Sequence, residues 1–135
     1  MVPSGNTSYK IEEISEKYIL EILKTSIKRY PNNVDILFEL GDLLTKRGFI
    51  KEGLDVDLKL SKLLPDDPVV HYNLACSYSL LGRKKEAFNE LKKAISLGYD
   101  DIDHMKNDRD LDPLKEDPKF KELIRSIQTR KFFLE

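Results

Sequence analysis

Residues 66–97, DDPVVHYNLACSYSLLGRKKEAFNELKKAISL, are the stretch of sequence that decides the fold. It opens with Asp67-Pro68, an N-cap acceptor followed by a proline in the first helical turn, where the absent N–H costs nothing. Apolar residues then recur at helical spacing as far as Gly82, and a second periodic run begins at Glu86. We therefore predict two short helices joined by a glycine turn.

The same hairpin pattern occurs earlier in the chain, at an offset of 34 residues. The offset aligns small or turn-forming residues with one another: Gly41 with Ala75, Gly48 with Gly82, and Gly53 with Ala87. No other offset gives comparable agreement. Small side chains at these positions let helix backbones approach closely, so we predict two hairpins that pack tightly.

The second hairpin resembles the tetratricopeptide (TPR) repeat. The residues that carry the resemblance match the large, small and turn positions of that family: Leu74-Ala75, Tyr78, Gly82, Ala87, Leu91 and Ala94. His71 departs from the pattern, because the family usually has a large aromatic residue there, and we expect it to be partly exposed. The resemblance implies an all-α solenoid of helical hairpins whose first helices line a concave groove that grips peptides or proteins.

The expected organisation is a disordered tail over residues 1–8 and a single TPR domain over residues 9–135. Within that domain we expect a leading helix over 9–30, repeats over 33–64 and 67–98, and a capping tail over 99–135. The tail sequence Leu111-Asp112-Pro113-Leu114, followed by Asp117-Pro118, is similar to segments that close bacterial and archaeal TPR arrays. A solenoid needs such a terminal helix to shield its last apolar surface.

The second helix of the first repeat departs from helical patterning. Leu54, Val56, Leu58 and Leu60 alternate like a strand, and Asp57 stands where Leu91 stands one period later. An inward-facing carboxylate is costly unless it is hydrogen-bonded. Either the helix is rotated so that Leu58 lies inside, which is the favoured interpretation, or Asp57 has a partner.

Bulk composition excludes several classes of protein. The 135 residues are 40% hydrophobic and 35% charged, with a net charge of −1, so no global field favours nucleic acid or an anionic membrane. We expect no nucleic-acid partner and no membrane span, because the apolar runs are only a few residues long. A single cysteine and the lack of an apolar leader favour a cytoplasmic location.

The inventory of reactive side chains is small: His71, His104 and Cys76. His71 and Cys76 point away from each other on one helix, which is poor spacing for shared metal ligation, and we expect Cys76 to be a packing residue. The acidic run DDIDHMKNDRDLD lacks the glycine and glutamate of an EF-hand calcium loop. We therefore expect no enzyme activity, no cofactor and no metal.

The groove that the resemblance implies can be assigned to particular residues. The candidates from the two first helices are Asp35, Phe38, Asp42, Thr45, Val69, Tyr72, Asn73, Cys76 and Ser79. Carboxylates on the earlier helix argue against an acidic ligand, so a neutral or basic segment is favoured. These faces could instead be ordinary solvated surface, or be covered by the leading helix.

Other functions remain open at this point. The alternatives are a homodimerising adaptor or chaperone-like scaffold and, from another class, a small enzyme or metal protein. The terminal helix carries Arg125, Arg130 and Lys131 beside Phe132-Phe133. We expect a solvated outer face with the apolar end docked on the core, and the alternative is contact with a partner or a membrane surface.

Overall fold

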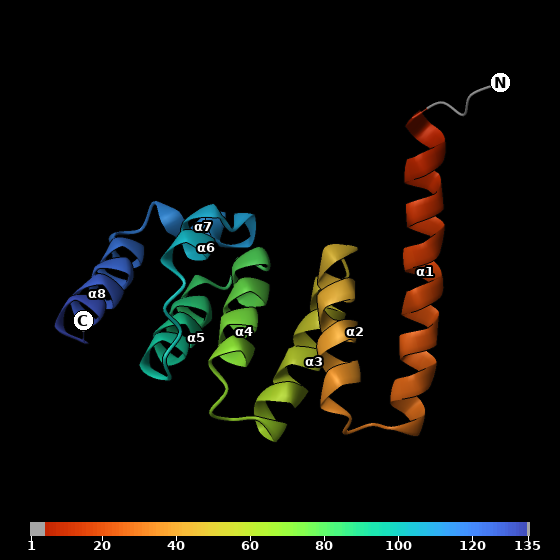
Figure 1. The fold of residues 1–135 in the computed structure, drawn as a ribbon, viewed down its shortest axis with the longest axis horizontal. Helices are drawn as coiled ribbons and strands as arrows, with labels where there is room; N and C mark the ends of the chain where they lie inside the picture. The colour runs from red at the N-terminus through yellow and green to blue at the C-terminus, as the bar shows by residue number, and fades with distance from the viewer. Residues whose placement is uncertain (1–4, 135) are drawn as a thin grey trace.

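The computed structural model describes residues 5–134, with side chains from residue 10 onward, and these residues fold into helices without a strand. The elements in chain order are α1 (Gly5–Arg29), α2 (Val34–Lys46), α3 (Ile50–Leu63), α4 (Pro68–Leu80), α5 (Lys84–Ser96), α6 (Ile102–Asn107), the 3-10 turn η1 (Arg109–Leu111), α7 (Asp112–Lys115) and α8 (Pro118–Leu134). They stack as a row from α1 at one end to α8 at the other (Figure 1). The predicted all-α solenoid with a leading and a capping helix is confirmed.

The two repeats are the hairpins α2–α3 and α4–α5. Each first helix is started by a side-chain cap, Asn33 for α2 and Asp67 for α4. Each turn passes through a glycine with left-handed backbone, Gly48 at φ 88° and Gly82 at φ 75°, a conformation that glycine adopts without steric cost. The helix α3 is continuous, so the alternating apolar residues do not form a strand.

The small residues mark close approaches between helices. A Cβ added at Gly53 would lie 2.6 Å from Oγ1 of Thr45, and one at Gly41 would lie 3.0 Å from Oδ1 of Asp57. Their equivalents in the second repeat, Ala75 and Ala87, are fully buried. The tight packing expected at these four positions is therefore present.

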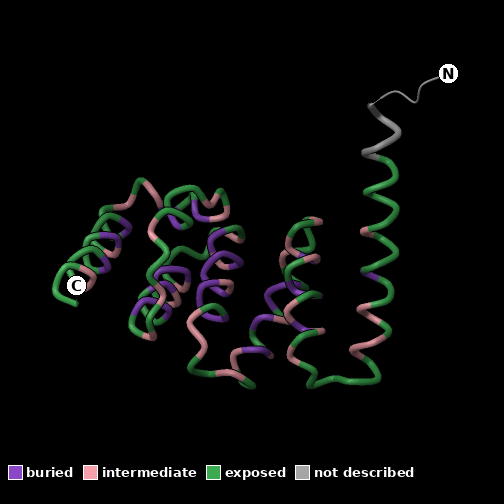
Figure 2. The backbone as a smooth tube through the Cα atoms, viewed as in Figure 1, coloured by how far each residue is buried: buried purple, intermediate pink, exposed green. Residues whose placement is uncertain are grey.

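The capping tail shares the core of the second repeat. Met105 of α6, Leu111 of η1, Leu114 of α7 and Ile127 of α8 are buried against α4 and α5. Figure 2 shows the buried segments on the facing sides of these helices. The guanidinium of Arg130 on α8 adds hydrogen bonds to the carbonyl oxygens of Ile95 and Tyr99, at 2.6 and 3.1 Å. The tail thus continues the hydrophobic core and covers the end of the array.

The leading helix α1 begins at Gly5, so part of the segment expected to be disordered, residues 5–8, is helical; residues 1–4 lie outside the described residues. Its C-terminal half packs on α2 through Leu20, with Leu23 and Ile27 beside it. Its N-terminal half is held by polar contacts to Lys46 and Arg47, and its apolar side chains there are exposed. Ile14 and Tyr18 are 66% and 71% exposed, so α1 covers α2 with only part of its apolar stripe.

Three sequence-based expectations are wrong in detail. Asp57 is buried and Leu58 is at the surface, so α3 is not rotated. His71 is also buried, at 3% exposure. Both of its ring nitrogens have polar partners inside the protein: Nδ1 lies 2.6 Å from Glu90 Oε2, and Nε2 lies 2.7 Å from the Pro65 carbonyl oxygen. Phe132 and Phe133 pack edge to face on each other but are 78% and 79% exposed, so the apolar end of α8 does not dock on the core.

Candidate functional site

The candidate site is a cavity of about 240 Å³ between the two first helices and the start of the capping tail. Its walls come from α2, α3, α4, α6 and the segment around η1, which are distant in sequence. The lining residues are Gly41, Asp42, Thr45, Asp57, Tyr72, Asn73, Cys76, Ser77, His104, Asp108 and Asp110. The cavity therefore lies where the predicted groove meets the docked tail.

The structure brings together only part of the predicted groove. Asp42, Thr45, Tyr72, Asn73 and Cys76 line the cavity. The other predicted groove residues lie outside it, at Asp35, Phe38, Val69 and Ser79. Of these, Asp35 and Val69 are exposed and Phe38 packs beside the Leu37 cluster. Ser79 is 1% exposed, so this prediction of a groove-facing side chain is wrong.

One carboxylate organises the wall formed by the tail. Oδ2 of Asp108 accepts a 2.7 Å hydrogen bond from the Tyr72 hydroxyl and a weaker one from the Cys76 thiol at 3.6 Å. Nε2 of His104 lies 3.4 Å from the same oxygen. Tyr72 also stacks on Tyr99, with ring centroids 4.3 Å apart. These contacts tie the α6–η1 turn to the middle of α4 and hold the aromatic side of the cavity.

The opposite wall contains a buried acid. Asp57 on α3 is 5% exposed, and its Oδ2 accepts a 3.0 Å hydrogen bond from the Ser77 hydroxyl on α4. Burial is the main cause that raises the pKa of Asp57 to about 7; the Ser77 hydrogen bond opposes this shift, and the nearby charge of Asp42 adds to it. The group is therefore close to half-ionised at neutral pH.

The cavity is strongly acidic as a whole. Burial, followed by repulsion from Asp108, raises the pKa of Asp110 above its ordinary value. Cys76 is a buried thiol whose pKa is raised well above the ordinary value, first by burial and then by the charges of Asp108 and Asp110. Reactive cysteines need the reverse shift, toward the thiolate. The arrangement therefore suits the binding of a cation better than nucleophilic chemistry.

Metal ligation at this site was not anticipated from the sequence. Cys76, Asp108 and Asp110 each present one potential ligand atom, and these atoms lie within 4.8 Å of one another. The relevant Asp108 oxygen, Oδ2, already accepts two hydrogen bonds, and the thiol is held in its protonated form. A metal ion binds a thiolate and a free carboxylate oxygen, so it would have to remove the thiol proton of Cys76 and replace the hydrogen bonds that Asp108 Oδ2 accepts.

Six of the lining residues escaped the sequence analysis as binding residues: Gly41, Asp57, Ser77, His104, Asp108 and Asp110. Two signals pointed toward them. Asp57 is a charge at a repeat position that is otherwise apolar, and the acidic run after Gly98 is denser than helix capping needs. Neither signal reveals that the two regions meet across α4.

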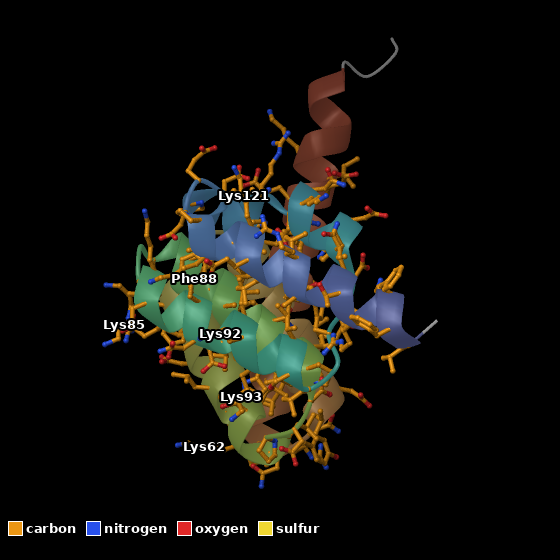
Figure 3. The ribbon with its side chains drawn as sticks, turned by 90° about the vertical axis from the view of Figure 1, so that its left-hand side faces the viewer. Lys62, Lys85, Phe88, Lys92, Lys93 and Lys121 are labelled. Atoms are coloured by element: carbon orange, nitrogen blue, oxygen red, sulfur yellow. The ribbon has the colours of Figure 1, made fainter. Side chains whose placement is uncertain are left out.

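The end face of the solenoid formed by α5 and α8 is rich in lysine, in contrast to the acidic cavity. Figure 3 shows Lys85, Lys92 and Lys93 on α5 and Lys121 on α8, gathered on the face away from α1. Lys119 lies 5.7 Å from the centroid of the Phe88 ring on that face. The acidic cavity is therefore separate from this lysine-rich end face. None of the helices in the described part combines the length and apolar character that a bilayer crossing needs.

Two of the three comparisons with known proteins found similar proteins. No protein-family model matches the sequence. Among curated proteins, the chain is 27% identical over 125 residues to a chloroplastic protein of Arabidopsis thaliana, covering 90% of this chain and 37% of that protein. The chain therefore spans little more than a third of that relative.

Among solved structures the neighbours are forms of MamA, a TPR-like repeat protein. A crystal structure of MamA matches with a TM-score of 0.71 and 22% identity, over 96% of this chain and 75% of that one. MamA AMB-1 matches with a TM-score of 0.59 and 29% identity, over 64% of this chain and 48% of that one. The repeat pattern, the stacked hairpins and these neighbours converge: this chain has the tetratricopeptide-type fold that its sequence resembles.

Proposed function

We propose that this chain is a protein-interaction scaffold that holds a neutral or basic segment of a partner protein along the face of α2 and α4. The observation that carries the proposal is the acidic cavity between these helices and the capping tail. A peptide groove needs a concave surface with a few polar groups that fix orientation, and this cavity supplies both. The TPR-like neighbours support a noncovalent scaffold role rather than catalysis.

Charge argues for the class of segment. Asp35 and Asp42 lie exposed on α2, and the cavity adds Asp57, Asp108 and Asp110. Complementary charge across an interface speeds association and rejects partners of the wrong sign. An acidic segment would meet like charges on α2 and in the cavity, so the ligand is neutral or basic.

Selection from a random peptide library against the immobilised full chain tests the proposal. We expect enrichment of lysine- or arginine-containing peptides whose binding weakens as salt rises. The substitution Asp42→Lys should slow their association, whereas Asp55→Lys, an exposed carboxylate on α3 outside the cavity, is the matched control. Selection of acidic peptides, or of peptides indifferent to Asp42→Lys, would refute the assignment of this face.

Self-association is the second candidate function, and one observation favours it. Apolar side chains are exposed at both ends of the row of helices, on α1 at Ile11 and Ile14 and on α8 at Phe132 and Phe133. Exposed apolar patches of this kind commonly mark protein contacts. Light scattering at tens of micromolar decides the matter, because a monomer there excludes an obligate dimer. For either function we propose a cytoplasmic location, which the unpaired, buried Cys76 suits.

A further inference from the structure

Three carboxylates in the cavity have no cationic partner. Asp42, Asp57 and Asp110 reach it from α2, α3 and η1. Among residues 10–134, no lysine or arginine forms an ion pair with any of the three. Asp57 is buried, Asp110 is half-buried and Asp42 is exposed at the rim. Charges removed from water are normally paired, so the ionised forms of these groups favour a cation in the cavity.

A second, independent feature lies on the α3 wall of the cavity. Asp57 is 95% withdrawn from solvent, and while Oδ2 is bound by Ser77, Oδ1 accepts no hydrogen bond from the described residues. Gly41 stands beside this oxygen, and a Cβ there would come to 3.0 Å from it. The equivalent position one repeat later is Ala75. The glycine therefore leaves space for a ligand's donor group next to Oδ1 of Asp57.

The wall formed by α4 and α6 is aromatic. Tyr72 and His104 both line the cavity, with ring centroids 5.5 Å apart and planes inclined by 48°. A guanidinium is planar, donates to carboxylates in a fixed fork and stacks on aromatic faces. An ammonium group is a point charge that lacks this combination. The mixture of acceptors and rings therefore matches arginine better than lysine.

We propose that this cavity is the socket for one arginine side chain of the bound segment, with its guanidinium between Asp57 and Asp110 and with Asp42 at the rim. The inference rests on the proposed function and adds the anchor residue of the ligand. The raised pKa values of Asp57 and Asp110 are consistent with it, since a bound guanidinium stabilises both ionised forms.

Nuclear magnetic resonance titration of the full chain with acetyl-arginine amide tests the socket directly. We expect saturable shifts in the amide signals of Gly41, Ser77 and Asp110. Acetyl-citrulline amide, which has nearly the same shape without the charge, should cause no saturable change, and acetyl-lysine amide should bind more weakly. Equal shifts with citrulline would overturn the proposal, because they would show binding without charge recognition.

Variants then locate the binding. Asp57→Asn keeps an acceptor for Ser77 and should weaken arginine binding at least tenfold, as should Asp110→Asn. Asp55→Asn, at an exposed carboxylate on α3 outside the cavity, is the control, and it should change binding by less than twofold. Gly41→Ala should also weaken binding by filling the space beside Oδ1. Circular dichroism and melting of each variant establish that it is folded.

Two further results would overturn the socket. One is stoichiometric Zn²⁺ or Ca²⁺ binding at Cys76, Asp108 and Asp110 that excludes arginine, which would make the cavity a metal site. The other is a library-selected peptide whose affinity survives both replacement of its arginines and Asp57→Asn. That second result would leave the scaffold function intact, whereas failure to select any peptide would count against the scaffold function itself.

Discussion

The hydroxyl of Ser77 on α4 donates a 3.0 Å hydrogen bond to the carboxylate of Asp57 on α3, and both residues are buried. This contact joins the two repeats through polar atoms. In the second repeat, the position equivalent to Asp57 is occupied by the apolar residue Leu91. A buried carboxylate with one hydrogen bond stabilises the fold less than a packed leucine. The acid is thus retained at a site where stability alone favours an apolar side chain.

Asp57 should make the stability of the protein depend on pH. Its pKa is about 7 in the folded state and near the ordinary 3.8 when unfolded, so between these values the folded chain keeps a proton that the unfolded chain has lost. The free energy of unfolding therefore falls as pH rises from about 4 to 7, by up to roughly 1.4 kcal/mol per pH unit. Urea titrations of the wild type and Asp57→Asn measure this contribution as their difference. A difference that is constant with pH contradicts the prediction.

The contact between Gly53 and Thr45 should be strongly coupled. Gly53→Ala places a Cβ 2.6 Å from Oγ1 of Thr45, whose rotamer is held by a 3.0 Å hydrogen bond to the Gly41 carbonyl. We expect this variant to lose about 1–3 kcal/mol by overpacking. In a Thr45→Ala background the same change should instead stabilise the protein by up to about 1 kcal/mol, because the close contact is gone and alanine favours helix over glycine. Additive effects in this double-mutant cycle would show that the close approach does not matter.

His71 should stabilise the start of the second repeat through both ring nitrogens. Nδ1 lies 2.6 Å from Glu90 Oε2 and Nε2 lies 2.7 Å from the Pro65 carbonyl oxygen, and a phenylalanine ring can make neither contact. We expect His71→Phe, which installs the aromatic residue typical of TPR repeats, to destabilise the fold by about 2 kcal/mol. Glu90→Gln should have a smaller effect. Thermal melting measures both, and an unchanged melting temperature for His71→Phe would contradict this role.

Arg130 should hold the capping helix in place. Its two hydrogen bonds reach the carbonyl oxygen of Ile95, near the end of α5, and that of Tyr99, just beyond it. Arg130→Met keeps the apolar stem and removes the donors, so we expect a loss of about 1–3 kcal/mol. Hydrogen exchange should speed up first in α8. Arg125→Met, at an exposed position of the same helix, should leave exchange rates unchanged.

Local signals predicted the secondary structure well. Gly48 and Gly82 both adopt the left-handed backbone at helix ends, and Asp67 caps α4 as its position before a proline implies. These features depend on a few neighbouring residues, which the sequence displays directly. The small-residue positions followed from the repeat offset, because packing between neighbouring hairpins recurs with the same period.

The site was harder to predict because its parts meet only through tertiary docking. Asp57 and Ser77 lie on consecutive helices, and their pairing depends on how α3 and α4 face each other. Asp108 reaches Tyr72 only after α6 and η1 fold back onto α4. The burial of Ser79 and the exposure of Phe133 likewise depend on where neighbouring helices end. Sequence periodicity gives the face of a helix but not what covers it.

The hydrogen bonds that converge on Asp108 have a thermodynamic consequence. The cavity has one wall from the repeats and another from the tail, so a ligand that touches both can bind only while the tail is docked. Thermodynamic linkage then makes two free energies equal. The free energy by which tail docking strengthens ligand binding is also the free energy by which bound ligand stabilises the docked tail against local unfolding. A bound ligand would therefore make local unfolding of the C-terminal tail rarer. This tail includes α8, which carries the exposed side chains of Phe132 and Phe133.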